Sequence, residues 1–192
     1  PYGLTKQMGE QMIESMAYAN KNINSVMLRY FNPAGAHPST LIGELPIDKP
    51  QNLAPVITQT AIGKLNELVV FGNDYPTPDG SCIRDLIHIC DLAHAHTLAL
   101  NHIIENKNTN NCLAYNIGSG TGISVFQAIK AFEENTGVKL NYRIGNRRPG
   151  DVIAIYADNE KARLELGWAP KYTLNDIMTS AWKWEQYIKD LP

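Results

Sequence analysis

Two residues at the start of the chain could perform acid–base chemistry together. Tyr2 and Lys6 are four positions apart, so on a helix their side chains lie on one face, one turn apart. An ammonium beside a phenol stabilises the phenolate, and each pKa unit removed from a tyrosine requires about 1.4 kcal/mol. The pair therefore predicts a Brønsted acid–base. The same spacing also fits an exposed tyrosine and a solvated lysine, so the rest of the chain must decide between the two readings.

A second set of residues could hold a diphosphate. Arg84 and the pair Arg147-Arg148 occupy predicted loop positions beside glycines, and the fork of a guanidinium matches phosphate oxygens. Salt-bridged surface arginines are the alternative reading, and Asp151, three residues after Arg148, is a ready partner. Residue types alone leave both readings open.

Two further clusters indicate structure rather than chemistry. The stretch 118–122 reads Gly-Ser-Gly-Thr-Gly, but Ile123 stands where the third glycine of a G-x-G-x-x-G dinucleotide motif belongs. We predict a tight strand-to-helix turn there. The histidines and cysteines within 82–96 contain no C-x-x-C pair and match no usual zinc spacing. We predict that they are packed or surface side chains and that no metal is bound.

The hydrophobic pattern predicts an α/β fold that positions these residues. Residues 1–20 are predicted to form a helix, and 26–31 is a nearly continuous apolar run, typical of a strand buried on both faces of a parallel sheet. Because such a strand needs neighbours and the chain opens directly on the helix, we expect it to be the C-terminal part of a longer protein. We predict further helices at 52–64, 90–105, 124–135, 158–166 and 173–187, strands at 68–71, 113–117 and 140–144, and loops at 32–38 and 73–85.

The composition is that of a globular protein. The 192 residues are 44% hydrophobic and 19% charged, and the net charge of -2 gives no reason to expect nucleic acid or a membrane surface as a partner. Cys82, Cys90 and Cys112 have no disulfide spacing, which favours a reducing cytoplasm. No apolar run approaches the length of a membrane span.

An ordered series of motifs makes a family resemblance specific. Tyr2-x-x-x-Lys6 is followed by the run Arg29-Tyr30-Phe31-Asn32-Pro33-Ala34-Gly35-Ala36-His37-Pro38, and the series continues through 51–53, 70–75, 79–80, 84–88 and 147–151. Over essentially its whole length the chain resembles the UDP-glucose (UDP-galactose) 4-epimerases of the extended short-chain dehydrogenase/reductase superfamily.

The resemblance implies a division of the fold. Residues 1–33 would be the C-terminal part of a Rossmann-like, doubly wound parallel sheet that binds NAD. Residues 34–192 would form a smaller α/β lobe that binds the UDP-sugar, with strand 113–117 a candidate to join the main sheet. In this family the full-length protein is usually a homodimer that associates through the Tyr/Lys helix.

The resemblance also implies roles for individual residues. Tyr2 would take the proton of the hexose 4-hydroxyl while tightly bound NAD takes hydride from C4; the 4-keto sugar would turn over and receive both back on its other face. Lys6 would bind the nicotinamide ribose and lower the pKa of Tyr2, and Phe31 would contact the nicotinamide. The implied substrate contacts are Arg84 and Arg148 to the diphosphate, Asn52 and Leu53 beside it, Asp151 to the ribose, Val69, Val70 and Phe71 around the uracil, Asn32 near the hexose, and Ile155 near its C2 substituent.

Several points stay open. Gln51 stands where the family often has Asn, and Ile155 is intermediate in size at a position that governs access of N-acetylhexosamines. The family's glycine-rich NAD loop and catalytic Ser or Thr would lie upstream, so we expect these 192 residues alone to bind UDP-sugar weakly, if at all, and not to turn over. The alternatives are an epimerase acting on UDP-pentoses or UDP-N-acetylhexosamines, an NAD-dependent dehydrogenase, and a non-catalytic nucleotide-sugar-binding module.

Overall fold

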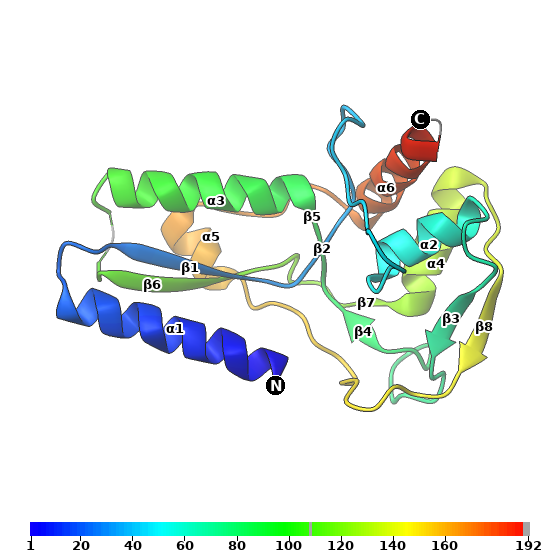
Figure 1. The fold of residues 1–192 in the computed structure, drawn as a ribbon, viewed down its shortest axis with the longest axis horizontal. Helices are drawn as coiled ribbons and strands as arrows, with labels where there is room; N and C mark the ends of the chain where they lie inside the picture. The colour runs from blue at the N-terminus through cyan, green and yellow to red at the C-terminus, as the bar shows by residue number, and fades with distance from the viewer. Residues whose placement is uncertain (108, 190–192) are drawn as a thin grey trace.

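The computed structural model describes residues 1–107 and 109–189 and contains two hydrophobic cores. One core belongs to the elements at the left of Figure 1, which we call the α1 lobe: α1, β1, β6, α3 and α5. The other belongs to the elements at the right, which we call the α4 lobe: α2, β3, β8, α4 and α6. The predicted α/β class is confirmed.

The α1 lobe is built on a pair of parallel strands. β1 (Ser25–Tyr30) pairs with β6 (Cys112–Ile117) over their full length. In Figure 1, α1 (Tyr2–Ala19) lies on one side of the pair and α3 (Ile89–Ile104) on the other; α5 (Glu160–Leu166) packs against β6 and α3. Every second residue of β6 is buried, as expected for a strand with one face on a core.

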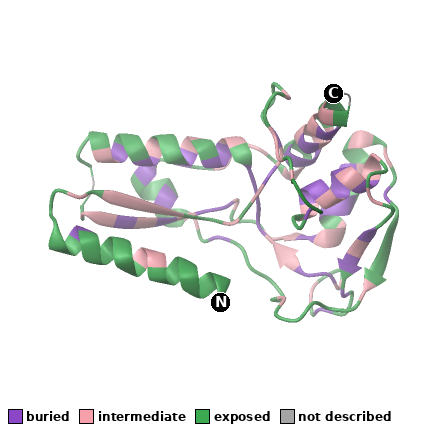
Figure 2. Cartoon of the chain, viewed as in Figure 1, coloured by how far each residue is buried: buried purple, intermediate pink, exposed green. Residues whose placement is uncertain are grey.

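The two faces of this strand pair are covered unequally. The core towards α3 and α5 includes the fully buried Trp168, whereas Ala17 is the buried residue of α1. Figure 2 shows α1 as a mostly exposed helix. β1 is half-buried and its last two residues are exposed, which differs from the predicted burial on both faces, because α1 covers its side of the strand sparsely.

The α4 lobe packs three helices against each other and against a second strand pair. These helices are α2 (Leu53–Ala61), α4 (Val125–Thr136) and α6 (Leu174–Lys189), and β3 (Leu68–Phe71) pairs in parallel with β8 (Tyr142–Gly145). A capping box between Ser124 and Gln127 begins α4. In the core, the Phe132 ring meets the Trp182 ring edge-on at a centroid distance of 5.6 Å.

Short strands connect the lobes. β2 (Asn32–Ala34) pairs in parallel with β5 (Leu86–His88), and β4 (Ile83–Arg84) pairs antiparallel with β7 (Ile123–Ser124). The sequence pattern predicted loops over 32–38 and up to residue 85, and this was wrong at the strands. Segments of two or three residues are too short to show a periodic pattern.

The longer elements lie close to their predicted ranges. The largest difference is at α2, which ends at Ala61 rather than 64. The pairing of β6 with β1 adds a strand from beyond residue 34 to the α1 lobe, and that lobe's core also contains residues of α3 and α5. The division at residues 33 and 34 therefore stays a prediction. No helix among the described residues is long and apolar enough to span a membrane.

Candidate functional site

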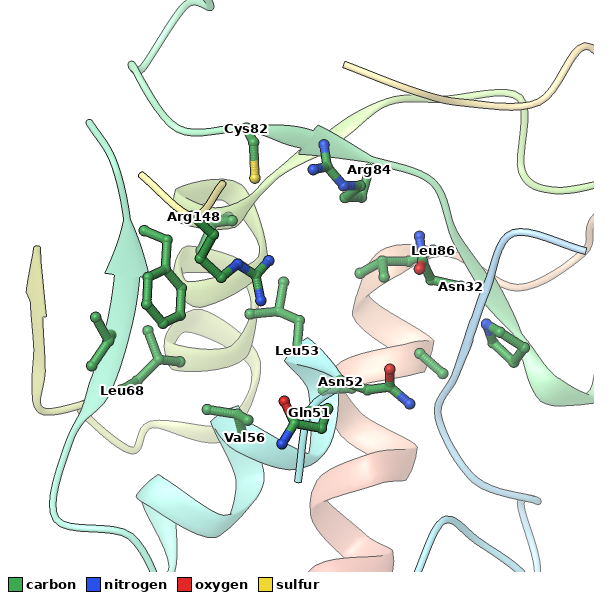
Figure 3. Close-up of a pocket in the computed structure, with 16 residues that line it drawn as sticks. Asn32, Gln51, Asn52, Leu53, Val56, Leu68, Cys82, Arg84, Leu86 and Arg148 are labelled. Carbon is green, nitrogen blue, oxygen red and sulfur yellow. The ribbon is translucent and has the colours of Figure 1, made fainter. Parts of the chain in front are cut away.

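A cavity of about 280 Å³ opens in the α4 lobe, where several elements end. Its walls come from β2, the start of α2, β3, β4 and the segment after β8 (Figure 3). Seven of the residues predicted to contact substrate line it: Asn32, Asn52, Leu53, Val69, Phe71, Arg84 and Arg148.

The two cavity arginines are held by one carboxylate. Asp151 accepts hydrogen bonds from Arg148 Nε at 2.9 Å and from Arg84 Nη2 at 3.3 Å. Arg84 Nη1 also donates to the carbonyls of Ile83 (2.7 Å) and Val152 (2.8 Å). Two positive charges thus share one negative charge at the cavity wall, which leaves a net attraction for an anion.

An apolar wall adjoins the arginines. Leu68, Val69 and Phe71 of β3 line this part of the cavity, and the Arg148 guanidinium lies 4.7 Å from the centre of the Phe71 ring. In Figure 3 the Arg148 side chain reaches into the cavity towards Leu53. Val70, also predicted at this wall, is 1% exposed and belongs to the hydrophobic core. The cavity therefore offers an apolar surface next to two guanidiniums, which suits a base attached to a diphosphate.

The start of α2 forms another wall. Asn52 is the N-cap residue of α2, but its side chain makes no capping hydrogen bond. Its amide instead donates to Glu44 Oε1 at 2.9 Å, and the Glu44 carbonyl accepts a hydrogen bond from Trp184 Nε1 at 2.8 Å. The first N–H groups of a helix have no partner within the helix and favour anions. This wall therefore complements the arginine pair.

The structure places the remaining predicted residues outside this cavity. Lys6 Nζ lies 5.3 Å from the centre of the Tyr2 ring on α1, and Tyr2 is 74% exposed. Phe31 joins β1 to β2, and its N–H donates to the Ile117 carbonyl at 3.1 Å. Ile155 is exposed beside β4, and its N–H donates to the Ile83 carbonyl at 3.2 Å. The roles of these four residues, like those of the residues that line the cavity, stay predictions.

The acid–base pair fits the cofactor that the resemblance implies. A phenol and an ammonium one helical turn apart are the groups that can bind ribose hydroxyls and exchange a proton with a sugar hydroxyl. In Figure 1 they lie at the end of α1 that is nearer to the α4 lobe.

Sequence reasoning missed two groups of residues. Cys82 and Leu86 line the cavity together with Arg84. Each of the two is two positions away from Arg84, and this spacing could have predicted their place, since alternate residues of a strand face the same side. The carboxylate of Asp85 accepts hydrogen bonds from the N–H groups of Ser119 (2.8 Å) and Gly120 (3.1 Å). The glycine-rich turn thus already binds an anion, a carboxylate of its own chain, which explains its resemblance to a phosphate loop.

The chain matches known proteins over most of its length. Residues 1–181 match the family model described as GDP-mannose 4,6 dehydratase. The chain is 50% identical over 186 residues to a UDP-glucose 4-epimerase of Yersinia enterocolitica, covering 97% of this chain and 54% of that protein. The chain therefore spans about half the length of this curated relative.

Solved structures show the same relationship. A UDP-glucose-4-epimerase from Stenotrophomonas maltophila, with bound NAD and formylated UDP-arabinopyranose, superposes with a TM-score of 0.95 at 44% identity, covering 100% of this chain and 56% of that one. A UDP-glucose 4-epimerase from Bifidobacterium longum in complex with NAD+ and UDP gives a TM-score of 0.92 at 43% identity, covering 99% and 56%. The resemblance found in the motifs is confirmed, and so is the fold that it implied.

Proposed function

The chain belongs to the family described as GDP-mannose 4,6 dehydratase. From this premise we propose that it is part of a UDP-hexose 4-epimerase. The proposed reaction interconverts UDP-galactose and UDP-glucose by transient oxidation at C4 of the hexose. The observation that carries the proposal is the cavity in which Arg84 and Arg148, bridged by Asp151, adjoin the apolar wall of β3. The individual relatives at 43–50% identity are UDP-glucose 4-epimerases, which favours epimerisation over dehydration.

In this proposal the cavity holds the UDP portion of the substrate. The Arg84 and Arg148 guanidiniums bind the diphosphate, with help from the start of α2 at Asn52 and Leu53. Val69, Val70 and Phe71 of β3 surround the uracil, through backbone groups in the case of the buried Val70. Asp151 then exchanges part of its arginine contacts for the ribose hydroxyls, and Asn32 and Ile155 face the hexose.

The chemistry belongs to α1. As the phenolate, Tyr2 removes the proton of the 4-hydroxyl and later returns it, and Lys6 stabilises that phenolate before the first step and after the second. NAD, when bound, supplies the hydride acceptor, with Tyr2, Lys6 and Phe31 as its contacts from this chain. Because only the diphosphate end of the substrate is clamped, the 4-keto sugar can turn over and present its other face.

A second substrate class has one observation in its favour. The Stenotrophomonas maltophila relative holds a UDP-pentose derivative, so a UDP-pentose 4-epimerase is the alternative within the same mechanism. A role with UDP-N-acetylhexosamines depends on the space left by Ile155. A net dehydrogenase would release NADH, and a non-catalytic nucleotide-sugar-binding module would show UDP binding without turnover.

The proposal is tested with a hybrid protein, because the relatives are about twice as long as this chain. Residues 1–192 replace the matching part of the Yersinia enterocolitica epimerase, and conversion of UDP-galactose, UDP-arabinose and UDP-N-acetylgalactosamine is followed with NAD present. We expect fastest conversion of UDP-galactose and no net NADH. A soluble, NAD-binding hybrid that epimerises none of the three would contradict the proposal. The 192-residue chain alone is expected to bind UDP-sugar more weakly than the hybrid, if at all, and to show no turnover.

Two further parts of the proposal concern location and assembly. Three free cysteines support a cytoplasmic location, since thiols stay reduced there. The exposed methionines of α1, at positions 8, 12 and 16, support a homodimer that forms through this helix. Analytical ultracentrifugation of the hybrid with Met12 replaced by Glu checks the second part, with a monomer as the expected result.

A further inference from the structure

Asp85 is fully buried between the two lobes, and its carboxylate has four hydrogen-bond donors. Ser119 donates from its N–H (2.8 Å) and its hydroxyl (2.6 Å) to Oδ1. Gly120 (3.1 Å) and Ala157 (3.0 Å) donate from their N–H groups to Oδ2. A buried carboxylate needs such compensation, and here backbone groups from two separate segments supply most of it.

The partners of Asp85 lie in segments that connect elements of the two lobes. Ser119 and Gly120 follow β6 of the α1 lobe and precede β7, whereas Ala157 lies between Asp151, the partner of the two cavity arginines, and α5 of the α1 lobe. Asp85 itself connects β4 to β5. Three passages of the chain are therefore joined by this one carboxylate.

The main chain of Asp85 holds a fourth passage. Its carbonyl accepts hydrogen bonds from Asn32 N at 3.1 Å and Asn32 Nδ2 at 2.9 Å, at the step from β1 to β2. Asn32 and the neighbouring Arg84 both line the cavity. The residue that joins the lobes is thus bonded to one cavity residue and adjacent in sequence to another.

Gly118, directly before the turn, has no room for a side chain next to the Asp85 carboxylate. A Cβ at Gly118 would lie 2.5 Å from Asp85 Oδ2 and 2.6 Å from the Ala157 Cβ. Only glycine at this position lets the carboxylate approach the N–H groups of the turn. The junction is therefore shaped around the side chain of Asp85.

We infer that Asp85 is a positioning residue that fixes the cavity relative to helix α1. The inference rests on the proposed function for its catalytic consequence: a substrate held by Arg84 and Arg148 meets Tyr2 in the right geometry only if the two lobes keep one arrangement. In the Asp85→Asn variant, an amide NH₂ faces backbone N–H groups where a carboxylate oxygen accepted their hydrogen bonds. The lobes should then sample several arrangements, while each lobe keeps its own core.

Asp79→Asn is the matched control. The Asp79 carboxylate accepts hydrogen bonds from Ser81 N (3.0 Å), Ser81 Oγ (2.8 Å) and Ser124 Oγ, all of which lie in the segments that lead into β4 or begin α4. Its loss perturbs the α4 lobe without touching the passages at 119–120 and 157. Ser119→Ala is a milder variant, because it removes one of the four donors to Asp85.

The direct test measures the arrangement of the lobes. Spin labels carried by non-canonical residues replace Glu14 of α1 and Lys130 of α4, both exposed, and pulsed electron resonance gives the distribution of distances between them. We expect a narrow distribution for the parent chain and for Asp79→Asn, a distribution at least about twice as wide for Asp85→Asn, and an intermediate one for Ser119→Ala. A width unchanged in Asp85→Asn, or increased equally in Asp79→Asn, would overturn the inference.

Kinetics of the hybrid enzyme provide the second readout. For Asp85→Asn we expect kcat to fall by about tenfold or more while the Kd for UDP changes by less than about threefold, since misplacement of reacting groups costs rate rather than affinity for the distal part of the substrate. Equal losses in both quantities would indicate a merely structural role. If the parent protein bound no UDP, the proposed function would fail, and the distance measurement would still decide the role of Asp85.

Discussion

The proposed functional side chains of the two lobes differ in how their neighbours hold them in place. In the α4 lobe the cavity residues hold one another: Asp151 bridges Arg84 and Arg148, and the Phe71 ring supports Arg148. In the α1 lobe Tyr2 and Lys6 lie on an exposed helix. Their side chains contact each other, and the other interactions described for them are backbone hydrogen bonds. Binding groups of this kind are pre-organised by their own lobe, whereas the acid–base pair acquires its geometry from the arrangement of the lobes. The two functions should therefore be separable by mutation.

The largest expected effect is on turnover and comes from α1. In the hybrid enzyme Tyr2→Phe should lower kcat by about 10²–10⁴-fold, the range for loss of a general acid–base, and leave the Kd for UDP unchanged. The matched control is Tyr18→Phe, because Tyr18 is also exposed on α1 and has a lysine, Lys21, 4.8 Å from its ring centre. Equal activities of the two variants would remove the assigned role of Tyr2.

The next largest effect is on the free energy of unfolding, and it compares how closely the two lobes are packed. Phe132 is fully buried in the core of the α4 lobe, so Phe132→Ala should lower the free energy of unfolding by about 3–5 kcal/mol. Met12→Ala, at an exposed position of α1, should change it by less than about 0.5 kcal/mol. Urea titrations of the 192-residue chain followed by circular dichroism measure both. A large loss for Met12→Ala would show that α1 is packed more closely than its exposure indicates.

A smaller effect is expected at the arginine pair. Arg148→Ala should weaken UDP binding by about 10–100-fold, since hydrogen bonds to charged groups contribute about 1.5–3 kcal/mol. Arg147 is the control: it pairs with Asp74 at 2.7 Å and lies over the Tyr75 ring at 4.1 Å, outside the cavity. Calorimetry should therefore find nearly parental affinity for Arg147→Ala. Equal losses at both positions would indicate a general charge effect instead of a site.

The smallest effect is a pH dependence of stability. Burial lowers the pKa of His88, although the charges of Asp91 and Asp176 act to raise it. A histidine whose pKa is lower in the folded state contributes stability that is present above its unfolded pKa, about 6.5, and is lost as the pH falls. The free energy of unfolding should therefore decrease from about pH 7.5 to pH 5.5, by less than about 1.4 kcal/mol for each pH unit.

His88→Gln tests the source of that slope. The variant should lower stability at neutral pH and flatten the slope below it. An unchanged slope in His88→Gln would assign the pH dependence to other groups. Unfolding curves at several pH values supply the comparison.

The sequence predicted the parts of the fold that have a long periodic pattern. All six helices in the described residues and the strands at β1, β3, β6 and β8 were expected from apolar spacing. β2, β4, β5 and β7 were not, because segments of two or three residues are too short to show a periodic pattern. The motifs located Arg84, Arg148 and the wall of β3, but the buried hydrogen bonds of Asp85 become visible only when residues 32, 119 and 157 are brought together.

Titration of the hybrid protein, which carries residues 1–192, with uridine, UMP and UDP tests most directly whether the cavity is a nucleoside diphosphate site. We expect one UDP per chain and a stepwise loss of affinity, from UDP to UMP to uridine, as fewer phosphate oxygens meet Arg84 and Arg148. Equal affinity for UMP and UDP, or no binding of UDP by a hybrid with native circular dichroism, would contradict this assignment of the cavity.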